Sequence, residues 1–438
     1  MKTSIFQTIL LVFLGLAFGV GVLIFAGVLP GFRSAQVGTE ATVLMWGTID
    51  GDDIADLIND INNKAKEAYK VDYVEKNLTT LNDDLLEALA TGRGPDLILL
   101  PHELLFQNRN KLSPLPFDSF SERQFRDYFV DSGLVFKTTE GWLAVPVAID
   151  PLVLYYNKDI YANANILTPP TSWEEFVLNQ PKLTAFDELR NIKQSAVSFG
   201  TSNNINNFKE ILSLLMMQVG VSPIVLDSKD NYIVGLNTIG KISSTDTEMA
   251  LSFYGQFADL QRSTYTWNRS LPKDTEFFLA GNLANYFGLA SELSYVAERN
   301  PHLNFDVASV PRLNKGSNLT VGRLYGLAVL KNSTKQGPAF SAVLELALGS
   351  HKFPELNSLL SLPPVLRASL AKLPVDDISG QVFYREALVC RVWPDPSYNE
   401  TGKVFGDLVD NVATGRLTLK ASIDKAVKDL SLIIANSK

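Results

Sequence analysis

Residues that could carry out catalysis are scattered along this chain without the spacing that catalysis needs. Adjacent acids occur at Asp52-Asp53 and Asp376-Asp377, and a pair of carboxylates can act as general acid and base. At the start of a helix, however, neighbouring acids more often interact with the helix dipole or face solvent. The histidines stand too far apart in sequence to form a metal-binding motif, and they are His102, His302 and His351.

The sequence signatures of common enzyme classes are also missing. The chain contains no HExxH, no GxSxG, no GxxxxGK[ST] and no GxGxxG after a strand, which are the motifs of zinc proteases, serine hydrolases, NTPases and dinucleotide-binding enzymes. We therefore expect no enzymatic activity, no catalytic residue, no metal and no cofactor. The single cysteine, Cys390, cannot form an internal disulfide, and we interpret it as a small buried hydrophobic residue.

Composition narrows the class of protein further. The chain has 39 basic and 47 acidic residues, a net charge of −8, which argues against binding to nucleic acid. Charged residues at 20% and hydrophobic residues at 46% are typical of a globular protein. About 400 residues follow the N-terminal segment, which is more than one hydrophobic core usually contains, so we expect two lobes.

That N-terminal segment is apolar enough to cross a membrane. Ile9 to Leu29 is a run of 21 residues without charge, and as a helix it would be about 32 Å long, enough for a hydrocarbon core of about 30 Å. Neither Phe25-Ala26-Gly27 nor Arg33-Ser34-Ala35 offers small residues at both positions of a cleavage site. We predict an uncleaved single-pass anchor within residues 1–34, with a cleaved signal as the alternative. Lys2 before the run places the body outside the cytoplasm.

Strand-like and helix-like patterns alternate after the anchor. Short apolar runs predict strands, and apolar residues at i, i+3 and i+4 predict helices between them. This order favours a mainly parallel sheet with helices on both faces. Predicted strands are 42–46, 71–74, 97–100, 152–156, 305–310 and 324–330, and predicted helices are 54–68, 81–89, 208–217, 405–412 and 423–430, with a further helix opening at Ser172. The expected N-terminal caps are Thr80 and Ser172, and the expected C-terminal glycines are Gly92 and Gly415.

Five segments in a fixed order resemble the motifs of one protein family. Thr91–Ile98 is similar to GxGPDII, Val145–Asp159 to IPxxxxxxxLYYNKDLF, and Pro169–Phe176 to PPxTWEEF. Phe278–Ala284 resembles FxxGKAAM, and Trp393–Arg416 resembles the family's C-terminal end. These motifs are those of the extracellular solute-binding proteins that serve ABC importers, in particular the sugar-binding family that includes maltose-binding protein.

The resemblance implies a two-lobe α/β fold of the periplasmic-binding-protein type (type II), with a mainly parallel sheet flanked by helices in each lobe. Strands that cross between the lobes would act as a hinge. We expect these crossings near Val147–Asp150, Gly281–Tyr286 and Leu327–Lys331. The expected segments are 1–34 for the anchor, 35–149 and 283–328 for the first lobe, and 150–282 and 329–438 for the second lobe.

In such a fold the ligand lies in the cleft between the lobes, at the C-terminal ends of strands. A sugar needs flat apolar surfaces for its rings and planar polar groups for its hydroxyls. The resemblance places Glu103 and Asp150 on sugar-binding carboxylates. The expected ligand-binding residues are Trp46, Asp50, Glu103, Asp150, Asn203, Asn204, Tyr325 and Trp393, with Asn206, Asn207 and Tyr398 as further candidates.

Each candidate also has a purely structural interpretation. Trp46 could pack at the end of its strand, Glu103 and Asp150 could be solvated acids, and the asparagines could form an ordinary polar loop. We interpret Trp173 as packing its helix onto a lobe and Asp96 as capping backbone groups. The segment Gly288–Glu292 lacks an aromatic residue that the family often has there, which argues against a maltodextrin-like ligand.

Together these features predict a membrane-anchored, extracytoplasmic solute-binding protein, monomeric and without a nucleic-acid partner. It would capture a small ligand, a mono- or oligosaccharide, and deliver it to the permease subunits of an ABC transporter. One alternative is a surface-exposed interaction or sensor protein that uses the same fold to bind a polymer or a protein. An enzyme of another kind would need a pair of titratable groups with shifted pKa values in the cleft.

Overall fold

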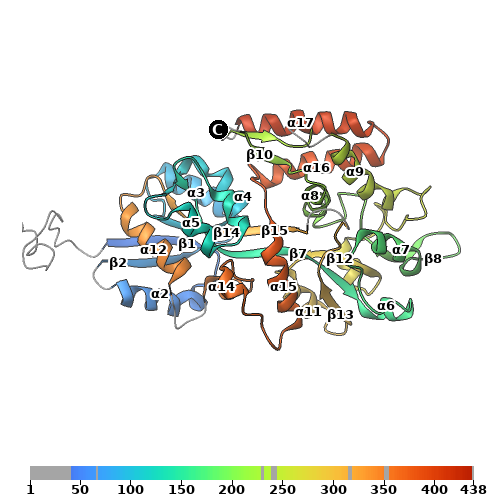
Figure 1. Cartoon of the computed structure of the whole chain (residues 1–438), viewed down its shortest axis with the longest axis horizontal. Helices are drawn as coiled ribbons and strands as arrows, with labels where there is room; N and C mark the ends of the chain where they lie inside the picture. The colour runs from blue at the N-terminus through green and yellow to red at the C-terminus, as the bar shows by residue number, and fades with distance from the viewer. Residues whose placement is uncertain are drawn as a thin grey trace, which may run out of the picture.

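Two lobes lie side by side along the long axis of the molecule, each around its own hydrophobic core (Figure 1). The computed structural model describes residues 41–65, 68–227, 231–237, 244–313, 318–349 and 355–436. The predicted anchor at residues 9–29 therefore lies outside the described residues. Among the helices that are described, none is both long and apolar enough to cross a membrane.

The first lobe is built on three parallel strands, as the sequence predicted. Strand β1 (Ala41–Gly47) lies between β2 (Tyr69–Glu75) and β3 (Leu97–Pro101), and helices α2 (Gly51–Ala65) and α3 (Leu81–Ala90) connect them. Helix α2 buries an apolar stripe at i, i+3, i+4 spacing against the sheet. The other elements of this lobe are α4 (His102–Gln107), η1 (Arg109–Lys111), β4 (Leu112–Ser113), β5 (Leu115–Pro116), α5 (Glu122–Tyr128), η2 (Asp131–Phe136), β6 (Gly141–Trp142), α12 (Gln336–Leu348), α13 (Leu356–Leu359) and α14 (Arg367–Leu370).

The second lobe is assembled around the C-terminal half of strand β7 (Val145–Asn157). Strands β12 (Leu283–Leu289) and β13 (Phe305–Ala308) pair with β7 antiparallel, and β9 (Ile192–Val197) pairs with β12 parallel. The other elements are α6 (Lys158–Asn163), α7 (Trp173–Leu183), β8 (Ala185–Phe186), α8 (Phe208–Gln218), β10 (Ile224–Leu226), β11 (Tyr232–Val234), α9 (Ser244–Gly255), η3 (Gln256–Ala258), α10 (Asp274–Leu279), α11 (Glu292–Arg299), α16 (Tyr398–Ala413) and α17 (Leu419–Asn436).

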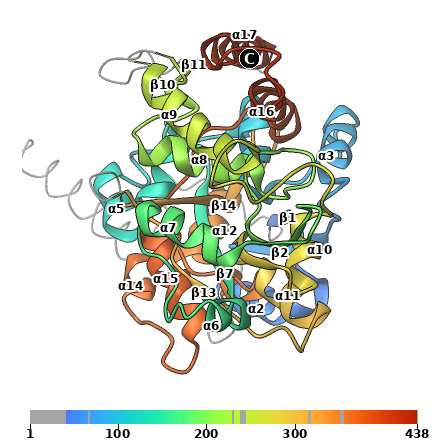
Figure 2. The same ribbon diagram turned by 90° about the vertical axis from the view of Figure 1, so that its right-hand side faces the viewer.

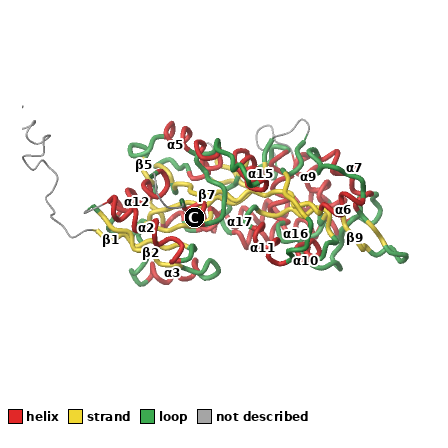
Figure 3. Tube along the Cα trace, turned by 90° about the horizontal axis from the view of Figure 1, so that it is seen from below, coloured by secondary structure: helices red, strands yellow, loops and turns green. Residues whose placement is uncertain are grey.

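One sheet extends through both lobes in the order β2-β1-β3-β14-β7-β12-β9-β8, where β14 is Thr320–Leu330. Seen from below, the strands run along the middle of the molecule with helices on both sides (Figure 3). Helices α8 and α16 lie on one side of β7 and β14, and α14 and α15 (Ile378–Val389) lie on the other (Figures 1 and 2). The prediction of mainly parallel sheets is wrong. The sheet is mixed, because β14 runs antiparallel to β3 and β7, and β7 runs antiparallel to β12.

The chain changes lobes along two long strands and one short connection in the described structure. On β7, Ile149 packs in the first core and Leu152 in the second. On β14, Val321 packs in the second core and Leu324 in the first. The short connection follows α15 through β15 (Cys390–Arg391), where Cys390 belongs to the first core and Trp393 to the second.

Two of the lobe boundaries differ from those expected at 282/283 and 328/329. Gly281, with φ of 77°, ends helix α10 instead of starting a crossing. The following strand β12 is buried along its whole length and adds to the sheet beside β7, so residues 283–313 and 318–320 continue the second lobe. Residues 331–349 and 355–370 then pack in the first lobe, because the chain enters that lobe along β14.

A small hairpin makes a further contact between the lobes. Strands β10 and β11 pair antiparallel, and the ring of Tyr232 lies 5.9 Å from that of Phe106 on helix α4. The guanidinium of Arg109 lies 5.0 Å from the Tyr232 ring, a distance at which a cation and an aromatic face attract.

Local features predicted from the sequence are mostly present. Ser172 Oγ accepts a hydrogen bond from the Glu175 N–H at 3.2 Å and caps α7. Gly92 and Gly415 have φ of 70° and 66° at the ends of their helices. Thr80 occupies the N-cap position of α3, as predicted, but its side chain makes no cap hydrogen bond there, because its hydroxyl donates to the Asn77 carbonyl.

Three residues interpreted as structural are confirmed in that role. Trp173 is buried, and its Nε1 donates to Gln218 Oε1 at 2.7 Å. Asp96 Oδ2 accepts from the Leu44 N–H at 2.9 Å, which ties β1 to the start of β3. Cys390 is fully buried and unpaired, and burial raises the pKa of its thiol.

Candidate ligand-binding site

A cavity between the lobes gathers charged and aromatic side chains from both of them. The first lobe contributes the start of α4, the second lobe contributes α8 and the chain around the start of α16, and β14 passes between them. The cavity leaves about 20 Å³ for the centres of water molecules, which suits one or two waters. We call it the interlobe cavity, and its walls are His102, Glu103, Lys209, Glu210, Ser213, Val321, Gly322, Trp393, Asp395 and Tyr398.

Glu103 reaches the cavity because strand β3 ends at Pro101 and helix α4 begins immediately after it. Its carboxylate is buried, with Oε1 3.2 Å from Arg323 Nε and Oε2 3.1 Å from His102 Nδ1. Burial would raise the pKa of the Glu103 carboxyl, but His102 and the Arg323 guanidinium hold that pKa below its usual value. Glu103 is therefore a carboxylate at neutral pH.

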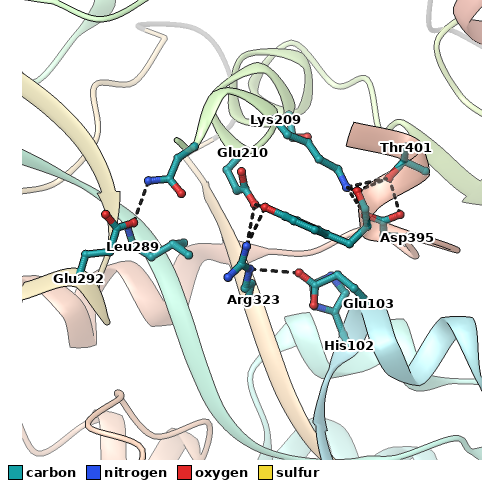
Figure 4. Close-up of polar contacts among 12 residues, drawn as sticks. His102, Glu103, Lys209, Glu210, Leu289, Glu292, Arg323, Asp395 and Thr401 are labelled. Atoms are coloured by element: carbon teal, nitrogen blue, oxygen red, sulfur yellow. Dashed lines mark hydrogen bonds and ion pairs between the residues drawn. The ribbon is translucent and has the colours of Figure 1, made fainter. Parts of the chain in front are cut away.

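Arg323 is the cation that joins the two lobes at this point. It lies on β14 beside the cavity, between Glu103 of the first lobe and Glu210 of the second (Figure 4). Its Nη2 donates to Tyr398 Oη at 2.7 Å and lies 3.4 Å from Glu210 Oε1. Burial alone would lower the pKa of the guanidinium, but the two carboxylates hold it well above its usual value.

Glu210 and Tyr398 complete this group on the second lobe. Tyr398 Oη donates to Glu210 Oε1 at 2.8 Å while it accepts from Arg323. Burial and the nearby Glu210 raise the pKa of the Tyr398 hydroxyl, so it remains a neutral donor. Glu210 itself is buried in the first turn of α8.

Lys209, the neighbour of Glu210 on α8, makes a separate set of contacts in the cavity lining. Its ammonium group is hydrogen-bonded to Asp395, to the Tyr398 carbonyl at 3.1 Å and to Thr401 Oγ1 at 2.7 Å (Figure 4). The ammonium also lies 4.1 Å from the centre of the Tyr398 ring, where a cation–π attraction operates. These three bonds use the three donors that a lysine possesses.

The sequence also matches the profile of a known protein family. The sequence profile of bacterial extracellular solute-binding proteins matches residues 51–343, well over half of the chain. This chain belongs to the bacterial extracellular solute-binding protein family. The resemblance inferred from the five sequence motifs is thereby confirmed.

Individual relatives of this solute-binding protein are distant in sequence. A provisionally named binding protein of Brucella abortus (strain 2308) is 21% identical over 266 residues, which is 60% of this chain and 61% of that protein. A counterpart from Brucella suis biovar 1 gives the same values. The chain thus aligns with less than two thirds of the length of these relatives.

Solved structures with the same fold are matched over almost their whole length. A cyclo/maltodextrin-binding protein complexed with maltotetraose superposes with a TM-score of 0.68 at 16% identity, covering 91% of this chain and 98% of that one. The cyclic alpha-maltosyl-1,6-maltose binding protein from Arthrobacter globiformis gives a TM-score of 0.74 at 16% identity, covering 91% and 100%. The two-lobe fold predicted for this solute-binding protein is confirmed by these matches.

The structure brings two of the predicted ligand-binding residues into the interlobe cavity, Glu103 and Trp393. Trp393 is stacked on Phe405 with ring centres 6.0 Å apart, and its Nε1 donates to Ser213 Oγ at 3.3 Å. Tyr398, one of the further candidates, lines the same cavity.

Asp150 and Tyr325 lie close to this group but do not line the cavity. Asp150 is fully buried on β7 beside Arg323, and its Oδ1 accepts from the Ser291 N–H at 2.9 Å. Burial raises the pKa of Asp150 to about 6, against the opposing effects of the Ser291 bond and the Arg323 charge. Tyr325 is half-buried on β14, two residues after Arg323 and on the same strand face.

The remaining predicted residues lie elsewhere. Trp46 packs in the first core with the Lys76 ammonium 4.1 Å from its ring, and Asp50 is an exposed acid whose Oδ1 accepts from the Asp52 N–H. Asn203 is exposed, whereas Asn204 is buried and donates to the Asn268 and Leu271 carbonyls. Asn206 and Asn207 likewise bond within the second lobe, to Thr275 and to Glu292.

Four residues of the cavity group were missed by the sequence analysis: Lys209, Glu210, Arg323 and Asp395. A signal existed for Arg323, because it is a charge within the otherwise apolar strand Thr320–Leu330, and a buried charge needs partners. Lys209 and Glu210 open an otherwise apolar helix in the same way. Among the described residues, no three His, Cys, Asp or Glu side chains are grouped so as to hold a metal ion.

Proposed function

We propose that this solute-binding protein captures a carbohydrate between its lobes on the extracytoplasmic side of a membrane and delivers it to an ABC permease. The interlobe cavity is the observation that carries the proposal, because both lobes supply polar side chains to it. Glu103 and Glu210 can accept hydrogen bonds from sugar hydroxyls, and Trp393 and Tyr398 offer aromatic surfaces to sugar rings.

The position of the cavity suggests how binding is coupled to lobe movement. It lies beside β14, where the chain passes from one core to the other, so rotation about β7, β14 and the connection at Cys390–Trp393 opens or closes it. In its present form it is too narrow for a sugar ring. A ligand enters an opened cleft and favours closure in proportion to its higher affinity for the closed form.

The family and the solved neighbours support this assignment. The family consists of extracellular solute-binding proteins. Of the two neighbours described above, one is a cyclo/maltodextrin-binding protein complexed with maltotetraose and the other is a cyclic alpha-maltosyl-1,6-maltose binding protein. The apolar run at residues 9–29 would hold the protein at the membrane, close to a permease. A carrier of this kind releases its ligand unchanged.

Calorimetric titration of the full-length chain in detergent tests the proposal. Maltotetraose, cellotetraose and tetra-N-acetylchitotetraose are suitable probes, and we expect at least one to bind with one site per chain and to be recovered intact. Glu103→Ala should weaken that binding by about 10- to 150-fold, since a bond to a charged group contributes about 1.5–3 kcal/mol.

A matched control is the exposed acid Glu188 on the second lobe, whose change to alanine should leave the affinity unaltered. Absence of binding to every saccharide, or equal affinity in the parent and Glu103→Ala, would contradict the proposal. Multiple turnovers of a cleaved product would show an enzyme instead.

A further inference from the structure

An open hollow on the first lobe combines an apolar floor with basic side chains. It lies between helix α3 and the chain that follows strand β14, and it has a volume of about 500 Å³, which is within the range of ligand sites. Its apolar part comes from α3, where 41% of Leu86 is exposed. We call it the α3 hollow, and its lining is Leu86, Leu89, Ala90, Lys111, Lys331 and Asn332.

The two lysines of the α3 hollow have no acid to pair with. They are neighbours, because the Lys331 N–H donates to the Lys111 carbonyl at 2.8 Å. The Lys111 ammonium donates to Asn108 Oδ1 at 3.0 Å, and partial burial lowers the pKa of that ammonium group. Neither lysine forms an ion pair among the described residues, and the exposed acids of α3, Asp83 and Glu87, lie outside the lining. An anionic ligand would supply the missing counterion.

A third cation, Arg93, lies beside the hollow. Arg93 is exposed and precedes Gly94 in the loop after α3. A side chain at Gly94 would come within 2.7 Å of Leu89 Cδ2 and 3.6 Å of Asn332 Nδ2, so this loop borders the hollow. The Arg93 guanidinium likewise has no carboxylate partner in the part of the chain that the structure describes. Three positive charges therefore gather here on a chain whose net charge is −8.

The hollow lies at the end of the sheet where the chain enters the first lobe. Strands β1 and β3 are parallel, and the Asp96 N–H just before β3 donates to the Leu44 carbonyl of β1 at 2.9 Å. The N–H of Leu330, the residue before Lys331, donates in turn to the Asp96 carbonyl at 2.9 Å. The hollow and the start of β1 therefore share the end of the lobe that lies away from the second lobe (Figure 1).

This end of the lobe is also the one closest along the chain to the predicted anchor. The apolar run ends at Leu29 and β1 begins at Ala41, so the chain between them can span at most about 40 Å. The anchor thus keeps the hollow near the lipid surface. An anionic phospholipid presents a phosphate beside acyl chains, and this combination matches cations at the edge of an apolar floor.

We infer that the α3 hollow and Arg93 bind the headgroup region of an anionic phospholipid, so that the first lobe docks on the membrane beside its anchor. The inference goes beyond carbohydrate binding and rests on the anchor in the proposed function. Docking would fix the first lobe and leave the second free to rotate, since β7, β14 and the connection at Cys390–Trp393 join them.

A spin label at Asn332→Cys tests the docking in the full-length chain. Asn332 lines the hollow, its side chain makes no hydrogen bond among the described residues, and Cys390 is too buried to be labelled. The chain is reconstituted in nanodiscs of phosphatidylcholine, alone or mixed with phosphatidylglycerol, and collisions of the label with a neutral water-soluble nickel chelate are measured by electron resonance. We expect fewer collisions in the anionic discs, and a recovery at about 0.5 M NaCl, because salt screens surface charges.

Arg93→Gln combined with Lys331→Gln removes two of the three cations. Each cation near an anionic surface contributes about fivefold to binding, so this pair should lower the ratio of docked to undocked molecules about 25-fold. Lys182→Gln combined with Lys403→Gln changes the net charge equally at exposed positions of the second lobe, and it should leave the label shielded.

Equal collision rates in the two kinds of disc would overturn the inference, as would shielding that survives Arg93→Gln combined with Lys331→Gln. A full-length chain that does not remain with the discs would overturn the anchor and the docking together. Calorimetry with saccharides measures the proposed carbohydrate binding separately, so a loss of docking leaves that function standing.

Discussion

Replacing Arg323 with methionine should destabilise the protein more than the loss of an ordinary surface charge. The guanidinium lies 3.2 Å from Glu103 Oε1 and 3.4 Å from Glu210 Oε1, and each contact corresponds to about 5 kcal/mol of attraction at an effective dielectric constant of about 20. Desolvation of the three ions offsets much of this attraction.

The variant, however, leaves two carboxylates buried at one point without their shared cation. Breaking a buried ion pair from one side typically costs about 3–5 kcal/mol. Because 28% of the Arg323 side chain is exposed, we expect the lower value, about 3 kcal/mol of unfolding free energy. Urea denaturation at neutral pH, followed by tryptophan fluorescence, measures it.

Two further variants test whether the loss of stability comes from the buried ion group or from removing any arginine. Arg123→Met removes a guanidinium with a side chain that is 92% exposed and should cost less than about 0.5 kcal/mol. Arg323→Met combined with Glu103→Gln should recover at least about 1 kcal/mol, because one unpaired charge disappears. If Arg323→Met is as mild as Arg123→Met, the reasoning about the buried group is wrong.

Three further predictions concern the rest of the molecule. The pKa of Asp150 rises from 3.8 to about 6 on folding, so the folded state keeps a proton that the unfolded state loses and stability falls as pH rises through this range. Asp150→Asn should not show this loss, which is about 3 kcal/mol of unfolding free energy. The difference in unfolding free energy between the variant and the parent should therefore change between about pH 4 and 7. A difference that stays constant over that range would contradict the prediction. Trp173→Ala should lower the unfolding free energy by about 3–5 kcal/mol without changing saccharide affinity, and a weakened affinity would refute its purely structural role. Deleting residues 1–34 should release a folded, soluble protein. The full-length chain should be recovered from membranes with Met1 or Lys2 at its N-terminus. A mature N-terminus between Ala26 and Gln36 would show cleavage instead.

Local pattern was sufficient to predict much of the first lobe. The strand at Thr42–Trp46 and the helix that follows it are fixed by residues near one another in sequence, and both are present as β1 and α2. The crossing expected at Gly281–Tyr286 is absent, because a buried apolar strand has the same pattern whether it leaves a lobe or, like β12, adds to its sheet. Which neighbour such a strand pairs with is decided by tertiary packing.

The candidate site depends even more on contacts between residues that are far apart in sequence. Glu103 could be identified by its place after a predicted strand, but its partner Arg323 is 220 positions further along the chain. Asn204 lies in a polar cluster that resembles a ligand loop, yet its amide is used by the Asn268 and Leu271 carbonyls. A sequence shows which polar residues exist, whereas the fold decides which of them already have partners.

A distance measured across the cleft shows whether a carbohydrate is bound between lobes that close on it. Glu87 on α3 and Lys403 on α16 are exposed positions on the two lobes, on the same side as α4 and α8 (Figure 1). Spin labels on Glu87→Cys and Lys403→Cys in the full-length chain would report their separation by pulsed electron resonance, while Cys390 stays buried. We expect a saccharide shown by calorimetry to bind to shift the distribution to a single, shorter distance. An unchanged distribution at saturating saccharide would contradict it.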